Sequence, residues 1–539
     1  MRTLALAAAS LTLSCGKSPL ETAIASSQKQ WWRDGVCYEI FVRSFVDSDG
    51  DGVGDLRGLT SRLDYVNDGN PNSVADLGAN CIWLMPISKS VSYHGYDVTD
   101  YYHVDPRYGT DEDFRQLMRE AHRRAIHIIV DFVPNHSSDE NPWFQSALQG
   151  LNSPYRNWYR WSAAKPDQLG PWGQVAWHKS PLHEEYYYGV FWHGMPDLNY
   201  ETPALLAEMK NVLRHWVTNM GADGFRFDAV PYLVEEGSEL KHTRGTHEVL
   251  RQLGAAVRSV NPSSFTVGEM ADGNAQILAS YYPDQLDAYF AFDVASGTLE
   301  SARTGAAAPF LSAVREANSL FPAGRWSPFL TNHDQPRVMT AMAGDRARAR
   351  VAASAMLMLP GLPFVYYGEE IGMMGSKPDE QIRTPMQWSN APGAGFTAGT
   401  PWESPQSDWA ATNVQAQDAD AASLLNHYQR LIHLRNAHSA LGTGELVVGT
   451  ANDPALAAFV RRSPTETILV IANFGARAVP KPSVTMDSGS GTPLTGRLEL
   501  IHEDPSNGCA PDAVVAAGGS ATLGQIAPYG LCVFRLAGS

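Results

Sequence analysis

Four short polar motifs follow apolar, β-rich runs in a fixed order along this chain of 539 residues. They are Asp131–His136, Gly224–Asp228, Gly268–Met270 and Thr331–Asp334. A strand-end carboxylate is common in any α/β protein, so one such motif alone is weak evidence. Four of them at the C-terminal ends of predicted parallel strands are typical of a (β/α)8 barrel, whose polar residues gather at that face. The motifs therefore predict an α/β protein built on a TIM barrel.

Strands alternate with helices from about residue 36, and eight β/α units can be traced. The strands are predicted at residues 36–45, 79–86, 126–133, 224–230, 264–270, 288–293, 328–334 and 362–370. Thr110–Asp113 resembles a capping box that begins a helix. A second amphipathic helix starts near Leu205 and is closed by Gly221.

Two regions depart from this alternation. Residues 137–199 lack helical periodicity and are dense in Trp, Tyr, His and Pro, which predicts an inserted domain after the third strand. Beyond about residue 440, short alternating segments predict a C-terminal antiparallel β-sandwich. The predicted division is a leader and linker at 1–30, barrel segments at 31–136 and 200–440, inserted domain B at 137–199, and the β-sandwich at 441–539.

The N-terminus resembles an export signal. Arg2 precedes the mostly apolar run Leu4–Leu13, which is too short to span a bilayer as a helix and is typical of a secretory leader. Cleavage of the lipoprotein type would leave Cys15 as a lipidated first residue, and the alternative is ordinary cleavage after Ala25. We expect an exported protein, periplasmic or at the cell surface, held by a lipid anchor at Cys15.

The cysteines and the net charge indicate the redox state of the chain and limit the classes of partner that it can bind. Cys37 and Cys81 lie in apolar strand-like runs, which predicts buried thiols, whereas Cys509 and Cys532 could pair. The formal net charge of -16 argues against nucleic acid or anionic membrane surfaces as partners. Contact with a membrane is then expected only through the lipid anchor.

Three carboxylates, Asp228, Glu269 and Asp334, lie at predicted strand ends. Cleavage of an acetal needs one carboxylate as nucleophile, one carboxyl group as proton donor, and negative charge to stabilise an oxocarbenium-like transition state. Arg226 lies two residues before Asp228, so both side chains face the same side of the strand. A guanidinium there would keep Asp228 ionised.

These motifs, together with Gly95-Tyr96-Asp97 and Gly368–Glu370, make the chain similar to the α-amylase family of glycoside hydrolases over roughly residues 31–539. The resemblance implies that Asp228 is the nucleophile, Glu269 the general acid/base and Asp334 the carboxylate that stabilises the transition state. It also implies retention, with the carboxyl groups of Asp228 and Glu269 about 5–5.5 Å apart. The substrate-binding residues implied are His94, Tyr96, Asp97, His136, Arg226 and His333.

Two further segments narrow the resemblance. Met195–Asn199 resembles the signature of a subgroup intermediate between oligo-1,6-glucosidases and neopullulanases, and Arg383–Trp388 is similar to a segment of α-glucosidases and trehalose synthases. Tyr93 stands where exo-acting α-glucosidases of the family carry an acidic residue, and Tyr93-His94 is typical of α-amylases, although Tyr93 could equally pack within its loop.

The expected function is therefore retaining, endo-acting hydrolysis of α-1,4-glucosidic bonds in maltooligosaccharides and starch. The alternatives are an α-glucosidase, a glucosyltransferase or isomerase of the trehalose synthase type, and a non-catalytic glycan-binding barrel.

An acidic, glycine-rich loop, Asp47–Asp55, follows the first predicted strand. Gly58 replaces the glutamate that an EF-hand needs at its twelfth position, so the loop is not an EF-hand. Similar loops in the oligo-1,6-glucosidase branch bind calcium, and the alternative is a solvated acidic turn. The resemblance implies a structural Ca²⁺ held by the side chains of Asp47, Asp49, Asp51 and Asp55 and the carbonyl of Val53. A second calcium site of many α-amylases is not expected, because Ala229–Pro231 stands in place of its Lys-His pair.

Overall fold

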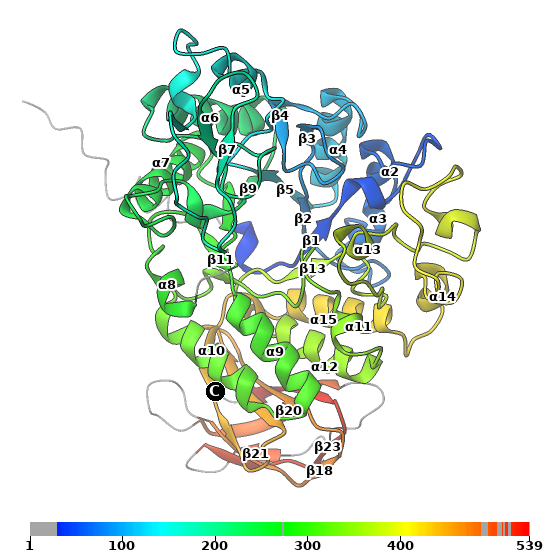
Figure 1. The fold of residues 1–539 in the computed structure, drawn as a ribbon. Helices are drawn as coiled ribbons and strands as arrows, with labels where there is room; N and C mark the ends of the chain where they lie inside the picture. Colours follow the sequence, from blue (N-terminus) through cyan, green and yellow to red (C-terminus); the bar gives the residue numbers. More distant parts are fainter. Residues whose placement is uncertain are drawn as a thin grey trace, which may run out of the picture. The chain divides into compact units, whose positions relative to one another are not determined.

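Eight parallel strands form the central sheet of the computed structural model, which describes residues 30–271, 274–486, 494–503, 509, 513–515 and 519–537 (Figure 1). In sheet order they are β12 (Trp326–Ser327), β11 (Ala288–Phe290), β10 (Phe265–Gly268), β9 (Gly224–Phe227), β5 (His127–Phe132), β2 (Cys81–Leu84), β1 (Cys37–Ile40) and β13 (Phe364–Tyr366). The amide of Phe364 donates to the carbonyl of Pro328 at 2.8 Å, so the last strand meets the end of β12 and nearly closes the sheet. The predicted (β/α)8 barrel is confirmed.

The seventh strand lies earlier in the chain than the sequence pattern predicts. The predicted range is residues 328–334, but the paired strand is Trp326–Ser327, so the two ranges do not overlap and the Thr331–Asp334 motif lies in the loop beyond the strand. Pro328 has no amide hydrogen to donate to a neighbouring strand, so the ladder stops there. The other three motifs lie within their strands or directly after them, as predicted.

The helices around the barrel begin and end where local signals place them. In α4 (Asp111–Arg123), the Thr110 side chain accepts from the Asp113 amide and the Asp113 carboxylate accepts from the Thr110 amide, which confirms the capping box. Gly221, with φ of 90°, ends the helix formed by α6 (Pro203–His215) and the π-helical turn η4 (Trp216–Met220). Other helices of the barrel are α2 (Leu56–Ser61), α3 (Leu63–Val66), α7 (Arg244–Val260), α8 (Ala275–Ala279), α9 (Phe292–Thr304), α10 (Ala308–Leu320), α12 (Arg346–Leu357) and α15 (Leu424–Ala437).

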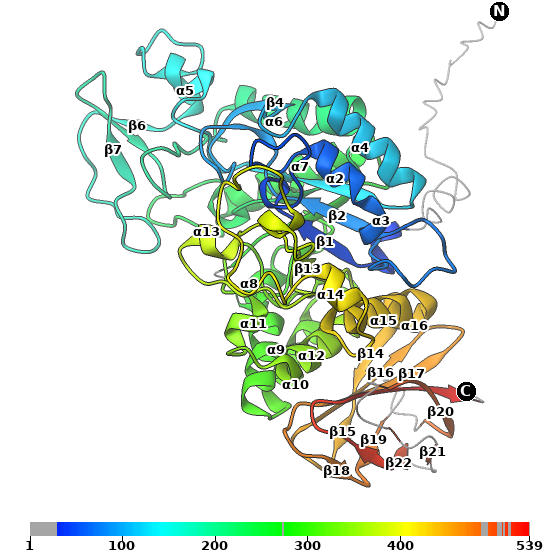
Figure 2. The same cartoon turned by 90° about the vertical axis from the view of Figure 1, so that its right-hand side faces the viewer.

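The segment between β5 and α6 forms a small lobe beside the barrel mouth. It contains α5 (Pro142–Ala147) and a three-stranded antiparallel sheet of β6 (Trp161–Ser162), β8 (Tyr186–Tyr188) and β7 (Trp177–Lys179). Figure 2 shows α5, β6 and β7, in cyan to green, projecting away from the barrel strands. An isolated bridge between His136 and Asp197 attaches the lobe to the segment that follows β5, and a second bridge, between Tyr159 and Leu198, joins two parts of the lobe itself.

The C-terminal residues form antiparallel sheets. The largest has the order β14 (Glu445–Val448), β16 (Leu456–Arg462), β17 (Thr467–Asn473), β24 (Leu531–Ala537), β20 (Gly496–Glu503) and β21 (Ala513–Val515). Smaller ladders pair β15 (Thr450–Ala451), β19 (Ser483–Thr485) and β22 (Ser520–Thr522), and β18 (Val479–Pro480) with β23 (Gln525–Ile526). The Phe310 ring on α10 contacts Phe459 and Phe474, with centroids 6.2 Å and 5.5 Å away, so this region packs on the barrel helices (Figures 1 and 2). The predicted antiparallel sandwich is confirmed.

The cysteines correct one prediction. Cys37 on β1 and Cys81 on β2 are partners in the parallel register and form a disulfide, so the expectation of two buried thiols is wrong. Nothing in their spacing revealed that the two strands would be neighbours. Cys509 and Cys532 form a second disulfide. The expected leader, with Cys15, lies outside the described residues, and no helix among the described residues is long and apolar enough to cross a membrane.

Candidate active site

A buried arginine joins three strand ends at the C-terminal end of the barrel. Arg226 on β9 is fully buried, and its Nη1 donates to Asp131 Oδ1 at 2.9 Å and to Asp228 Oδ1 at 2.6 Å. Its Nη2 lies 3.1 Å from Glu269 Oε2. Charge-assisted contacts of this length stabilise the ionised carboxylates and also hold their side chains in a fixed orientation. Asp228 and Glu269 therefore contact the same guanidinium, which is compatible with the separation predicted for a retaining pair.

The backbone turns sharply after Asp228. Ala229 adopts a left-handed conformation with φ of 47°, which is strained for a residue with a side chain. Its amide donates to Glu269 Oε2 at 3.1 Å. Burial raises the pKa of Asp228 above its usual range, and Glu269 and Asp131 add to that rise while Arg226 opposes it. The strained turn thus aims a backbone donor at the second carboxylate.

Asp334 is held by two cations. His333 Nε2 lies 3.2 Å from Asp334 Oδ2, and Arg383 Nη2 donates to Asp334 Oδ1 at 2.7 Å. Partial desolvation would raise the pKa of Asp334, whose side chain is 44% exposed, but these two ion pairs outweigh it and hold the pKa well below its usual range. His333 also contacts Glu39 Oε1 at 2.6 Å through Nδ1, and although burial opposes it, the carboxylates of Asp334 and Glu39 raise its pKa to about 9. Asp334 is therefore a stable anion.

Two predicted binding residues present polar atoms beside these carboxylates. The Tyr96 hydroxyl lies 2.6 Å from His333 Nε2 and 3.2 Å from Asp131 Oδ2. His136 is buried, its Nδ1 contacts Asn135 Oδ1 at 3.0 Å, and its Nε2 has no hydrogen-bond partner among the described residues. Burial lowers the pKa of His136 to about 3, so the ring is neutral and Nε2 can bond to a ligand hydroxyl.

These groups border one cavity of about 300 Å³. Its lining residues are His94, Tyr96, His136, Phe191, Met195, Asp228, Ala229, Glu269, Asp334, Asp379 and Arg383. Arg226 and His333 lie behind this lining and contact its members. Asp97 is buried and is not among the lining residues, and its carboxylate accepts hydrogen bonds from the Ser92 amide at 3.2 Å and the Ser92 hydroxyl at 2.5 Å. The three predicted catalytic carboxylates, Asp228, Glu269 and Asp334, therefore line the same cavity.

Several residues of the site were not singled out from the sequence as functional. Arg383 appeared only within a segment quoted for its resemblance, and Glu39, Phe191 and Asp379 carried no signal of their own. Arg383 also donates from Nε to the His333 carbonyl at 3.0 Å. Arg383 follows Asp334 by 49 residues, so no local sequence pattern could predict the ion pair between them.

Tyr93 packs on the protein. Its ring stacks on Trp402 with centroids 5.3 Å apart and an angle of 27°, and meets Phe41 edge-on at 6.5 Å. It is half-buried and is not among the residues that line the cavity. The packing alternative for Tyr93 is therefore the arrangement observed.

The acidic loop after β1 gathers three of its carboxylates. Ligand atoms of Asp47, Asp49 and Asp55 lie within 4.8 Å of one another, and Asp47 and Asp55 are buried. Asp51 lies outside this group, and its Oδ1 accepts from the Val53 amide at 2.7 Å. Converging carboxylate oxygens are the donors that Ca²⁺ prefers, so the residues present fit that ion.

With this geometry in view, comparison with known proteins gives the family. The profile of the Alpha-amylase family, described as "Alpha amylase, catalytic domain", matches residues 39–444. The chain belongs to the α-amylase family. It is accordingly a glycoside hydrolase, and the carboxylates around Arg226 occupy the barrel face at which such barrels place their active sites.

Relatives within the α-amylase family differ in their named activities. Alpha-amylase 3 of Dictyoglomus thermophilum is 38% identical over 459 residues, covering 84% of this chain and 87% of that protein. Trehalose synthase/amylase TreS of Mycolicibacterium smegmatis is 31% identical over 509 residues, covering 82% and 84%. The crystal structure of the alpha-amylase from H.orenii has a TM-score of 0.83 at 38% identity and covers 94% of this chain and 99% of that one.

Proposed function

We propose that this glycoside hydrolase is an endo-acting α-amylase that cleaves α-1,4-glucosidic bonds of maltooligosaccharides and starch with retention. The observation that carries the proposal is the sharing of one guanidinium by Asp228 and Glu269, with Asp334 bordering the same cavity. Two carboxyl groups held together, with a third whose pKa lies well below its usual range, supply the nucleophile, the proton donor and the stabilising negative charge that acetal cleavage needs.

In the first step, a carboxylate oxygen of Asp228 attacks the anomeric carbon of the bound sugar. The bond from that carbon to the glycosidic oxygen breaks, and Glu269 gives its proton to the leaving oxygen. In the second step, Glu269 takes a proton from water, the water oxygen bonds to the anomeric carbon, and the Asp228 carboxylate departs. Two inversions give overall retention.

The neighbouring charges suit these steps. Arg226 stabilises the ionised form of Asp228, which is the form that attacks. Asp334 stays negative because His333 and Arg383 flank it, so it can stabilise the positive charge that develops on the sugar ring. His136 Nε2 is positioned to bond to a sugar hydroxyl group at the cavity wall, and Tyr96 also lines that wall, its own hydroxyl being held by Asp131 and His333.

An aromatic surface next to the cavity supports action on longer chains. Phe191 lines the cavity beside His136, their ring centroids being 5.2 Å apart. Trp172 packs on Phe191 at 5.6 Å and on Tyr232 at 5.3 Å, and remains 54% exposed. An exposed indole held in place by other rings offers an apolar face on which a sugar ring can stack. We infer that Trp172 binds a glucose unit outside the cavity.

The test is a product time course on a maltoheptaoside blocked at its non-reducing end, with trehalose assayed in a parallel reaction on maltose. Rapid internal cleavage of the blocked chain is expected for the proposed α-amylase. A blocked substrate that stays intact, with glucose released from maltose, would instead identify an α-glucosidase. Conversion of maltose to trehalose without release of glucose would identify an isomerase, in keeping with the name of the mycobacterial relative.

We also propose that the Asp47, Asp49 and Asp55 carboxylates hold a structural Ca²⁺, with Asp51 and the Val53 carbonyl as the further ligands that the family resemblance implies. The loop lies against residues 396–402: the Thr397 hydroxyl donates to Asp47 Oδ2 at 2.5 Å and the Trp402 amide to the Gly52 carbonyl at 2.9 Å. An ion here would stabilise the packing of the first βα loop and take no part in bond cleavage.

We propose, finally, that the protein is exported and anchored by a lipid on Cys15. Two disulfides, Cys37–Cys81 and Cys509–Cys532, support an oxidising compartment. The test is mass spectrometry of the mature N-terminus from membrane fractions. A diacylglyceryl-modified Cys15 is expected, whereas a chain beginning after Ala25 would show ordinary secretion and an intact Met1 would exclude export.

A further inference from the structure

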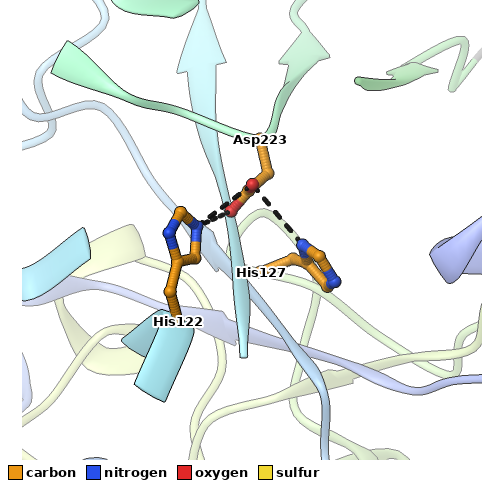
Figure 3. A group of neighbouring side chains, drawn as sticks. All are labelled: His122, His127 and Asp223. Carbon is orange, nitrogen blue, oxygen red and sulfur yellow. Dashed lines mark hydrogen bonds and ion pairs between the residues drawn. The ribbon is translucent and has the colours of Figure 1, made fainter. Parts of the chain in front are cut away.

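A second group of titratable side chains lies at the N-terminal ends of the barrel strands. His122 is in the last turn of α4, His127 is the first residue of β5, and Asp223 directly precedes β9 (Figure 3). Catalytic residues of such barrels lie at the opposite, C-terminal ends of the strands. This cluster is therefore separate from the proposed active site and from the acidic loop after β1.

The three side chains converge on a single point. His122 Nε2 lies 2.9 Å and 3.1 Å from the two carboxylate oxygens of Asp223, and His127 Nδ1 lies 3.4 Å from Asp223 Oδ1. One ligand atom from each residue lies within 4.8 Å of the others. Ligands bound to Zn²⁺ at 2.0–2.1 Å in a tetrahedron are separated by about 3.3 Å. The distances from the two histidine nitrogens to the Asp223 oxygens are therefore close to the separation between two ligand atoms of a tetrahedral zinc site.

We propose that His122, His127 and Asp223 bind a divalent transition-metal ion of the zinc type. Two imidazole nitrogens and one carboxylate oxygen are donors that suit Zn²⁺, Ni²⁺ or Cu²⁺ rather than Ca²⁺ or Mg²⁺, which take oxygen ligands. The side chains of His122, His127 and Asp223 are 47%, 30% and 15% exposed, so the cluster is open to ions from solvent. Water would complete the coordination.

Asp223 contacts both histidines, His122 at 2.9 Å and His127 at 3.4 Å, so one carboxylate already holds the two imidazoles near one another. A backbone hydrogen bond also holds the Asp223 carboxylate in place, because the Ile128 amide donates to Asp223 Oδ2 at 2.8 Å. Metal ligands are commonly fixed by such outer hydrogen bonds. An ion between the three residues would join the end of α4 to the starts of two adjacent barrel strands.

The experiment uses the full chain without a polyhistidine tag, in excess Ca²⁺ so that the acidic loop is occupied. Zn²⁺ is titrated calorimetrically into the wild type and into His122→Gln, His127→Gln and His103→Gln. His103 is the matched control, because its Nδ1 lies 2.8 Å from Asp100 Oδ2 in a pair that has only one histidine. We expect one equivalent of Zn²⁺ on the wild type and the control, with affinity at least about tenfold weaker in His122→Gln and His127→Gln.

Visible absorption and thermal unfolding give two further readouts. Co²⁺ bound by the wild type should give visible absorption typical of nitrogen and oxygen ligation, and Zn²⁺ should displace it. Zn²⁺ should also raise the unfolding temperature of the wild type and of His103→Gln but not of the two cluster variants. No Zn²⁺ binding by the wild type, or binding that both cluster variants retain, would overturn the proposal. Hydrolytic activity is not the readout, so failure here and failure of the proposed α-amylase activity are distinguishable.

Discussion

Two buried arginines, Arg226 and Arg435, solve the same electrostatic problem in different ways. Arg226 at the barrel mouth contacts Asp131, Asp228 and Glu269. Arg435 on α15 donates only to backbone carbonyls in the hydrogen bonds of the described residues, those of Gly35, Leu357, Leu359 and Gly361, at 2.6–3.2 Å. Burial lowers the pKa of Arg435 to about 9, whereas the carboxylates around Arg226 outweigh burial and raise its pKa well above the usual value.

The difference separates chemistry from architecture. Carboxylates can gain protons, lose them and form bonds, so an arginine surrounded by them sets the charge state of reactive groups. Backbone carbonyl oxygens cannot gain or lose protons in this way. An arginine that donates only to them provides hydrogen bonds for buried carbonyl groups and holds the segments that carry those groups together. Disrupting each arginine should therefore affect different quantities, and the following predictions are ordered from the largest effect to the smallest.

Removal of the nucleophile beside Arg226 should have the largest effect. Asp228→Asn is expected to lower kcat by about 10⁴-fold or more, because an amide oxygen is a poor nucleophile for the anomeric carbon. The unfolding temperature should change little. Initial rates on maltoheptaose measure the effect, with Asp284→Asn, 53% exposed and remote from the cavity, as the control. Substantial residual activity in Asp228→Asn would remove Asp228 from its proposed role.

Loss of the guanidinium itself should move the pH profile. Burial already raises the pKa of Asp228, and Arg226 opposes that rise, so Arg226→Gln should raise this pKa further. The reactive form is the ionised carboxylate, and activity is lost as pH falls through its pKa. The acid limb of kcat/KM should therefore shift to higher pH, with a loss of about 10³-fold at neutral pH. Arg226→Lys, which keeps the charge, should shift it less, and an unmoved limb in Arg226→Gln would contradict this account.

The equivalent change at the other arginine should affect stability alone. Arg435→Met leaves carbonyls of Gly35, Leu357, Leu359 and Gly361 without their donor and should lower the free energy of unfolding by about 3 kcal/mol. Denaturant titration measures this loss. The kcat per folded molecule at 25 °C should stay within about twofold of wild type. A large fall in kcat with an unchanged midpoint would show that the two arginines are not functionally distinct.

Calcium removal tests a site that lies at neither arginine. Chelation should lower the unfolding temperature by several degrees, because an ion bound only to the native state stabilises it by mass action. Asp47→Asn should remove most of this calcium dependence, since Asp47 belongs to the converging group. Asp51→Asn should remove less, because Asp51 lies outside it. An equal loss of calcium dependence in both variants would show that Asp51 is as important a calcium ligand as Asp47.

The smallest effect should be on chain length. Trp172→Ala is expected to lower kcat/KM on maltoheptaose by about 3- to 10-fold, as the loss of one stacking contact of about 1 kcal/mol implies. Activity on maltotriose should change less. Trp192→Ala is the matched control, because Trp192 is also exposed, at 44%, packs on His193 and is not among the residues that line the cavity. Equal losses on both substrates would place Trp172 outside substrate binding.

Local patterns in the sequence determined much of this protein. Apolar, β-rich runs, four of them ended by polar motifs, predicted eight strands, and Thr110–Asp113 and Gly221 predicted where two helices begin and end. The three carboxylates that we propose as catalytic could be singled out because each directly follows a strand or lies in the loop after one, and parallel strands bring their ends to one face, whereas their individual roles came only from the family resemblance. The position of β12 was predicted wrongly: the predicted run begins at Pro328, which has no amide hydrogen to donate, and the paired strand ends one residue before it.

The tertiary structure alone decided which distant residues meet. Glu39 pairs with His333 across 294 positions, Cys37 bonds to Cys81 across 44, and His122 reaches Asp223 across 101. Periodicity and spacing report only a residue's own strand or helix. Barrel closure chooses the neighbouring strand, and that choice sets which charges and thiols lie within bonding distance.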